Sequence, residues 1–120
     1  MKLYRPVGLY EMKKIFDLGL KCFPPRQTWQ PILYVVENYE YAQKIAKDWN
    51  TKDKNSGFVG YILEFIVSDI YMKKYELKQV GDKTHLEYWI PSDYVREFNE
   101  NIIGEIKVLD IYYGEKYSGS

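Results

Sequence analysis

The segment with the clearest chemical potential is a predicted strand in the C-terminal half, Thr84 to Ile90. Strand alternation divides its side chains between two faces, with Leu86, Tyr88 and Ile90 on one and His85, Glu87 and Trp89 on the other. The apolar set is expected to face the core, which leaves the second set as a candidate site. A carboxylate such as Glu87 can stabilise positive charge that develops on a substrate. An ordinary solvated strand edge explains the same pattern, so alternation alone leaves both interpretations open.

The chain is predicted to begin with a strand and a helix. Lys2 to Arg5 is expected to be extended and to end at Pro6, because a proline pushes the residue before it towards β geometry. Helical spacing then predicts a helix of about three turns, which Gly19 caps at its C-terminus. Its apolar stripe is Leu9, Met12, Ile15 and Phe16.

A second strand and helix follow a connection that is rich in proline and aromatic residues. This connection, Phe23 to Pro31, is a candidate for lining a site, since long loops in compact domains are often functional. Ile32 to Val36 is apolar and β-branched, which predicts a strand. Asn38 is expected to cap a helix whose apolar stripe is Ala42, Ile45, Ala46 and Trp49.

The next elements are expected to complete most of a sheet. The polar segment Asn50 to Gly57 is predicted to be a turn, and the apolar run Phe58 to Val67 a central strand buried on both faces. Tyr71 to Val80 is predicted to hold a short turn or helix and then a strand. Gly81 and Asp82 are typical of a hairpin turn that leads into the strand containing Glu87.

The C-terminal elements close the predicted domain. Pro91 and Ser92 are expected to begin a short helix, and Ile102 to Tyr112 is predicted to be the last strand. The side chains that this helix turns inward are expected to be Tyr94, Val95 and Phe98. The order of elements predicts a single α+β domain over residues 1–113, followed by a flexible tail over residues 114–120.

Composition narrows the classes of function. The 120 residues carry 17 basic and 17 acidic side chains without a block of like charge, which argues against a large electrostatic surface for duplex nucleic acid or an anionic membrane. No apolar run approaches the roughly 20 residues that span a bilayer. With one histidine and one cysteine, Cys22, the chain lacks the ligands of an ordinary zinc site. We therefore expect a cytoplasmic protein with no metal and no membrane partner.

Several single residues have plain structural interpretations. Cys22 is expected to behave as a small hydrophobic residue, because no partner base is recognisable near it. The three tryptophans, Trp29, Trp49 and Trp89, are expected to pack rather than to serve as stacking platforms for a ligand. Arg5 can equally be a surface ion-pair partner without a role in function.

The order of these elements and the residues on them resemble the ADP-ribosyltransferase superfamily. Leu3-Tyr4-Arg5 resembles the family's first strand, which carries an Arg or His that contacts NAD. The strand that contains Tyr34, followed by the aromatic-Ala pair Tyr41-Ala42, resembles the next element. His85-Leu86-Glu87 lies where the family places the catalytic acidic residue on a late strand.

Short bacterial proteins described as ADP-ribosylation-like have similar stretches. These stretches are Phe23-Pro24-Pro25-Arg26, Trp49-Asn50-Thr51-Lys52-Asp53 and Glu87-Tyr88-Trp89-Ile90-Pro91. The resemblance implies an ADP-ribosyltransferase-like fold, with a central antiparallel or mixed split sheet flanked by short helices. It also implies NAD as substrate. Together with the absence of a Gly-x-Gly-x-x-Gly run after a strand, it argues against a Rossmann-type nucleotide site.

The resemblance implies a role for each matched residue. Glu87 would be the catalytic carboxylate that stabilises an oxocarbenium-like ribose, Arg5 the anchor that binds NAD through forked hydrogen bonds, and Tyr34 the shelf for the cationic nicotinamide. Tyr4, His85 and Arg26 are further candidates for contact with NAD. The family often has Gln or Glu two residues before the catalytic Glu, whereas this chain has His85.

Three functions follow from these observations. The first is an NAD-binding mono-ADP-ribosyltransferase, or NAD glycohydrolase, that acts on an unidentified protein, nucleic-acid or small-molecule acceptor. The second is a non-catalytic module of the same fold that binds a nucleotide or a protein, which His85 in place of Gln or Glu favours. The third is a single-stranded RNA binder, suggested by the interleaved tyrosines and lysines of the segment from Tyr71 to Tyr75 and opposed by the neutral net charge.

Overall fold

The computed structural model describes residues 1–119, and within this range the chain is an α+β domain, as predicted. Its strands are β1 (Lys2–Val7), β2 (Ile32–Val36), β3 (Val59–Val67), β4 (Leu77–Gln79), β5 (Leu86–Pro91) and β6 (Ile102–Tyr113). Its helices are α1 (Leu9–Asp17), α2 (Tyr39–Asp48), α3 (Asp69–Met72) and α4 (Val95–Glu100). Short 3-10 turns cover Asn50–Lys52, Lys54–Ser56 and Ser92–Tyr94.

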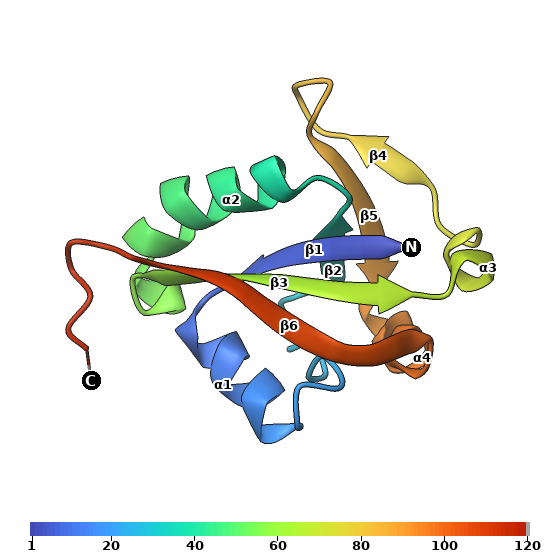
Figure 1. Ribbon diagram of the computed structural model, residues 1–120, viewed down its shortest axis with the longest axis horizontal. Coiled ribbons are helices and arrows are strands. Elements are labelled where there is room, and N and C mark those ends of the chain that lie inside the picture. Colours follow the sequence, from blue (N-terminus) through green and yellow to red (C-terminus); the bar gives the residue numbers. More distant parts are fainter. Residues whose placement is uncertain (120) are drawn as a thin grey trace.

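The described strands form one six-stranded sheet in the order β4-β5-β2-β1-β3-β6, and every neighbouring pair is antiparallel. In Figure 1, α2 covers one face of this sheet and α1 lies on the other. The pairing is uneven, since β1 and β3 share six register pairs from Lys2 to Val7. By contrast, β1 and β2 are in register only at Tyr4 and Val36. The sheet therefore opens between β1 and β2 beyond that pair.

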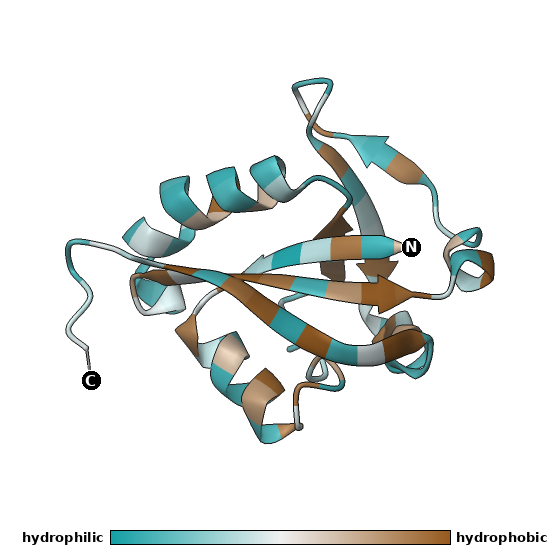
Figure 2. Ribbon diagram, viewed as in Figure 1, coloured by the Kyte–Doolittle hydropathy of each residue, from teal (hydrophilic) through white to brown (hydrophobic). Residues whose placement is uncertain are grey.

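Two hydrophobic clusters hold the helices on the sheet. The larger one joins the sheet face that carries Leu3, Leu33 and Phe65 to buried side chains of α1, α3 and α4. The smaller one lies under α2 and is formed by Val36, Tyr41, Ala42, Ala46 and Ile62. Figure 2 shows this division in the colouring of α2, which is hydrophilic over most of its outer side.

Local sequence signals predicted several boundaries well. The bounds of β2 are confirmed, and Asn38 caps α2, because its side-chain oxygen accepts from the Tyr41 amide at 3.1 Å. Gly19 ends α1 with a left-handed φ of 76°. The Leu20 amide donates to Ile15 at 3.0 Å and the Gly19 amide to Phe16 at 2.9 Å, which is the Schellman pattern.

Three predictions about strands were wrong. The first strand does not end at Pro6 but continues to Val7, which β1 tolerates because its pairing with β2 is limited to Tyr4. β3 is not the middle of the sheet, since it lies between β1 and the edge strand β6. β5 begins at Leu86 rather than Thr84, because the Asp82 side chain accepts from the Thr84 amide at 3.0 Å and holds a turn there.

Three apolar side chains predicted to face the core are exposed. Phe16 is 68% exposed, because the nine-residue helix α1 buries only the narrow stripe of Met12 and Ile15. Trp49 is 64% exposed, since α2 ends one residue before it and the chain turns away into a 3-10 helix. Tyr94 is 43% exposed in the turn that precedes α4.

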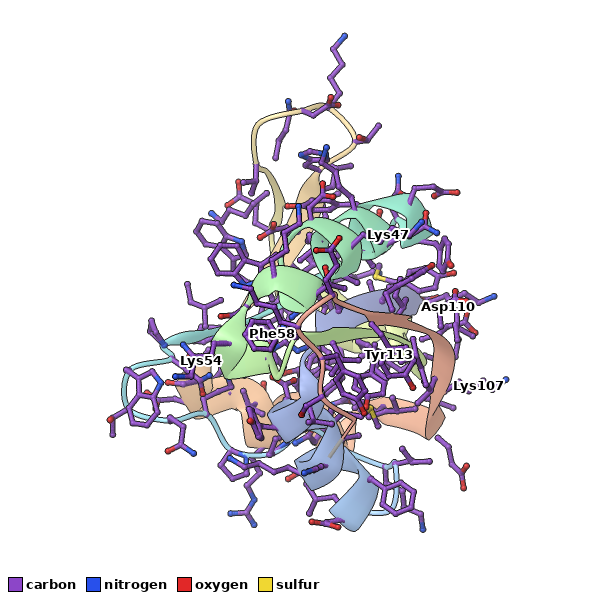
Figure 3. All side chains as sticks on the ribbon, turned by 90° about the vertical axis from the view of Figure 1, so that its left-hand side faces the viewer. Lys47, Lys54, Phe58, Lys107, Asp110 and Tyr113 are labelled. Atoms are coloured by element: carbon purple, nitrogen blue, oxygen red, sulfur yellow. The ribbon has the colours of Figure 1, made fainter. Side chains whose placement is uncertain are left out.

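The segment that follows β6 contacts the body of the domain. The Gly114 amide donates to Phe58 at 2.8 Å, and the ring of Tyr117 lies 4.7 Å from that of Tyr113. Phe58 and Tyr113, which are labelled in Figure 3, line one pocket. Ser120, the last residue of the predicted tail, lies outside the described residues.

No helix within residues 1–119 is both long and apolar enough to cross a membrane.

We expect Gly60→Ala to destabilise the protein, because α2 packs directly on β3 at this residue. A Cβ atom at position 60 would lie 2.9 Å from both the Cβ and the carbonyl oxygen of Ala46. Overpacking of this kind should lower the free energy of unfolding by about 1–3 kcal/mol in urea denaturation. Adding Ala46→Gly should recover part of the loss, because it removes one of the clashing atoms. Equal stability of Gly60→Ala and wild type would contradict the close contact.

Candidate functional site

Arg5 lies at the opening between β1 and β2. Its side chain is on the α1 face of the sheet, and the residue is only 4% exposed. The guanidinium reaches β2, where Nη1 donates to the Tyr34 carbonyl oxygen at 2.9 Å. An arginine side chain therefore links the two strands where their pairing stops. Arg5 is thus an ion-pair partner, as the alternative interpretation held, but a buried one rather than one at the surface.

Glu11 binds this guanidinium from the first turns of α1. Arg5 Nε donates to Glu11 Oε2 and Arg5 Nη2 to Glu11 Oε1, both at 2.8 Å, which is a bidentate geometry. Arg26, from the proline-rich loop, donates through Nη1 to the same Oε1 at 3.4 Å and through Nη2 to the Ile32 carbonyl at 3.2 Å. One carboxylate thus binds two arginines. Sequence reasoning missed Glu11, because an acidic residue early in a helix is an ordinary feature.

The charges of this cluster affect one another strongly. Burial alone would raise the pKa of the Glu11 carboxyl, but the charge and hydrogen bonds of Arg5, assisted by Arg26, hold that pKa below its ordinary value. For Arg26, burial and the neighbouring Arg5 charge lower the guanidinium pKa despite Glu11. Two cations and one anion in a buried group leave a surplus of positive charge.

Tyr34 connects this cluster to the carboxylate of Glu87. The Arg5 guanidinium carbon lies 4.9 Å from the centre of the Tyr34 ring, within the range of a cation–π contact. Burial raises the pKa of the Tyr34 hydroxyl, and the charge of Glu87 adds to this effect while Arg5 opposes it. The Tyr34 hydroxyl therefore stays protonated and neutral.

Glu87 is held by two neighbouring donors. It lies on β5 opposite Val36 of β2, and its Oε2 accepts from the Tyr41 hydroxyl of α2. Its Oε1 accepts from Trp89 Nε1 at 2.9 Å. Burial, followed by the hydrogen bond to Glu87, raises the pKa of the Tyr41 hydroxyl, so Tyr41 stays a donor. The helical periodicity of α2 was the signal that could have placed Tyr41 on the sheet-facing side.

His85 lies one residue before β5 begins, whereas the prediction placed it within the strand. Its ring stacks on that of Tyr41, with the ring centres 4.3 Å apart and the planes 6° from parallel. Tyr41 therefore links the two residues, since its ring stacks on His85 and its hydroxyl donates to Glu87. The physical reason is the turn centred on Asp82, which delays the start of the strand.

Two adjoining cavities bring most of the predicted residues together. A cavity of about 540 Å³, here called the Arg5 cavity, is lined by Arg5, Glu11, Arg26 and Tyr34, together with Trp49 and other residues. A cavity of about 530 Å³, here called the Glu87 cavity, is lined by Tyr34, Tyr41, Trp49 and Glu87. Because Tyr34 and Trp49 belong to both walls, the cavities are neighbours with a shared border.

Tyr4 is the predicted site residue that the structure leaves apart. It lies on β1 one residue before Arg5, but its side chain is on the α2 face of the sheet. Its ring packs edge-on against Tyr39 with 5.9 Å between ring centres, and it lines a different cavity with Glu37 and Lys83. Strand alternation separates the two neighbours, since consecutive side chains point to opposite faces.

The three tryptophans are exposed, whereas they were expected to be packing residues. Trp29 is 75%, Trp49 64% and Trp89 39% exposed. Trp29 belongs to the proline-rich loop and Trp49 follows the end of α2, so neither lies on a core-facing surface. Trp29 and Trp49 both line the Arg5 cavity.

Residues 1–119 contain no group of three or more His, Cys, Asp or Glu side chains that could hold a metal ion. The groups that could hold an organic cofactor are the cations and aromatic rings of the two cavities. No protein-family model, curated protein or solved structure matches this chain.

We expect Glu11→Gln to lower the free energy of unfolding by about 3–5 kcal/mol at neutral pH, because it leaves buried Arg5 without its counter-charge. The lowered pKa of Glu11 sets the sign of the pH dependence. The ion pair stabilises the fold above the ordinary carboxyl pKa of 4.5 and is lost as the pH falls through the lower pKa of the folded state. The difference between variant and wild type should therefore shrink below about pH 4.5 in urea titrations.

Glu97→Gln is a matched control for this prediction. Glu97 pairs with Lys74, but their side chains are 46% and 39% exposed, so its loss should lower the free energy of unfolding far less than Glu11→Gln does. A Glu11 variant as stable as the Glu97 variant would contradict a structural role for the buried pair.

Proposed function

We propose that the protein binds NAD in the two adjoining cavities and transfers its ADP-ribose to an acceptor, as a mono-ADP-ribosyltransferase, or to water, as an NAD glycohydrolase. The observation that carries the proposal is that Tyr34 and Trp49 line both cavities. A ligand that occupied both cavities would therefore extend past Tyr34 and Trp49. Cavities of about 540 and 530 Å³ lie in the range of small-molecule sites.

The opening between β1 and β2 supports an ADP-ribosyltransferase-like fold for this chain. A split central sheet with short helices on both faces is what the family resemblance implies. Here β1 and β2 share a single register pair, and Arg5 bridges the strands beyond it. The predicted residues Arg5, Tyr34 and Glu87 follow one another along the borders of the two cavities.

Glu87 has the features that cleavage of NAD requires. When the bond between the nicotinamide nitrogen and the ribose C1′ breaks, its electron pair leaves with nicotinamide and the sugar becomes oxocarbenium-like. A carboxylate at the ribose stabilises this charge, and the acceptor or water then forms a bond to C1′ and loses a proton. Hydrogen bonds from Tyr41 and Trp89 hold the Glu87 carboxylate in one orientation before the substrate arrives.

Arg5 serves in this proposal as a positioning residue. All three nitrogen atoms of its guanidinium donate hydrogen bonds, two to Glu11 and one to the Tyr34 carbonyl. Arg5 would therefore act by holding in place the strand that carries Tyr34. Tyr34 then offers its ring as a flat surface for the cationic nicotinamide. Arg26 borders the same cavity with one nitrogen unpaired and is the better candidate for an anionic part of NAD.

Glu87→Gln should reduce nicotinamide release at least about 100-fold, because an amide cannot neutralise the developing positive charge. NAD binding is measured by calorimetry and nicotinamide by chromatography. Glu100→Gln, an exposed change on α4, should leave release unchanged. The proposal would be contradicted if the protein does not bind NAD, or if Glu87→Gln does not affect the release of nicotinamide. Binding of NAD without release would favour the non-catalytic module instead.

Tyr41→Phe tests the orientation of Glu87. The variant loses the hydroxyl that donates to Glu87 but keeps the ring that stacks on His85. We expect kcat to fall by about tenfold with KM little changed, because the carboxylate is less well oriented in the transition state. A rise in KM at unchanged kcat would instead place Tyr41 in substrate binding.

A further inference from the structure

Two buried polar atoms point to a ligand in the Arg5 cavity. Among the described side chains, Arg26 Nε and Asn50 Oδ1 are the buried nitrogen and oxygen atoms that have no hydrogen-bond partner. Both residues line this cavity. Buried polar atoms are nearly always paired, so an unpaired one calls for an explanation. An unpaired donor and an unpaired acceptor therefore belong to two residues that line the same cavity.

A chain of hydrogen bonds fixes which atom of Asn50 is unpaired. Asp53 is a carboxylate and only accepts, so the Ser56 hydroxyl donates to Asp53 Oδ2 at 2.8 Å. The Ser56 oxygen then accepts from Asn50 Nδ2 at 3.0 Å. The amide nitrogen of Asn50 is therefore used within the protein, and its oxygen remains as an acceptor. A ligand that pairs with Asn50 must bring a donor.

The charges along the cavity favour an anion. Three cationic side chains line it, Arg5, Lys14 and Arg26, against two carboxylates, Glu11 and Asp53. Glu11 is shared by both arginines, and Asp53 is bonded to Ser56 and to the Asn55 amide. One positive charge is left without a counter-charge, which a phosphate group matches.

Exposed aromatic residues also line the cavity. Trp29, Trp49 and Tyr10 all line the cavity and are 75%, 64% and 53% exposed. Exposed aromatic rings at a cationic cavity are suited to stacking on a nucleobase. Trp49 directly precedes Asn50 in the sequence, and both residues line the cavity.

We infer that the Arg5 cavity binds an adenine nucleotide, with Asn50 Oδ1 accepting from the base amine, Trp49 and Trp29 stacking on the base, and Arg26 and Lys14 facing the phosphates. An amino-substituted base supplies the donor that Asn50 needs, and the choice of adenine rests on the proposed use of NAD. Hypoxanthine has an oxygen in place of that amine. It would face Asn50 Oδ1 with a second acceptor, so the site discriminates between the two bases.

Calorimetry with ADP and IDP tests this site. We expect wild type to bind ADP at least about tenfold more tightly than IDP, with affinity for both falling as salt is added. Asn50→Ala should bring ADP binding down to the level of IDP, and Trp49→Ala should weaken both. Phe16→Ala is the matched control, since Phe16 is as exposed as Trp49 but does not line the cavity. Circular dichroism confirms that each variant is folded.

Equal binding of ADP and IDP by wild type, an unchanged ADP preference in Asn50→Ala, or no ADP binding at about 1 mM would overturn the inference. The outcome is separable from that of the proposed reaction, because ADP contains no nicotinamide. Selective ADP binding without nicotinamide release would uphold this site and overturn the transferase. Nicotinamide release by a protein that does not prefer ADP would uphold the transferase and overturn the site.

Discussion

The buried guanidinium of Arg5 joins three elements of the domain, β1, α1 and β2. It is bound in bidentate fashion by Glu11 of α1 and donates to the carbonyl of Tyr34 on β2. A buried charge requires a partner, so neither α1 nor β2 can move away from β1 without exposing or unpairing it. Backbone pairing between β1 and β2 is limited to Tyr4 and Val36, and beyond it the hydrogen bond from the Arg5 side chain to the Tyr34 carbonyl links the two strands. The shape of the Arg5 cavity depends on this interaction.

The two ends of the site are organised in different ways. At the Arg5 end, charges are held within the protein and leave a positive surplus, which suits an anionic ligand. At the Glu87 end, a single carboxylate is oriented by a tyrosine and a tryptophan. Tyr34 lies between them and its hydroxyl is kept neutral by burial. Binding and bond cleavage would thus be assigned to neighbouring but chemically distinct surfaces.

Short-range sequence signals predicted where helices and strands begin and end better than they predicted which side chains are buried. The bounds of β2, the Asn38 cap and the Gly19 terminus depend on residues within a few positions of each other, and all three are confirmed. Whether Trp49 is buried depends instead on where α2 ends relative to the sheet. The start of β5 depended on one Asp82 side chain that competes with strand pairing. Such effects are not visible in hydrophobic periodicity.

The sequence by itself determined the α+β class and most element bounds, because periodicity and capping are local properties. It named Arg5, Tyr34 and Glu87 as candidates only through their resemblance to a family. Only the tertiary structure decided that Glu11 binds Arg5, that Tyr41 binds Glu87 and that Asn50 keeps an unpaired oxygen. Each of these partners comes from a different element, and their meeting depends on how α1, α2 and the turn after α2 pack against the sheet. Packing of that kind is set by the whole chain, so no short stretch of sequence encodes it.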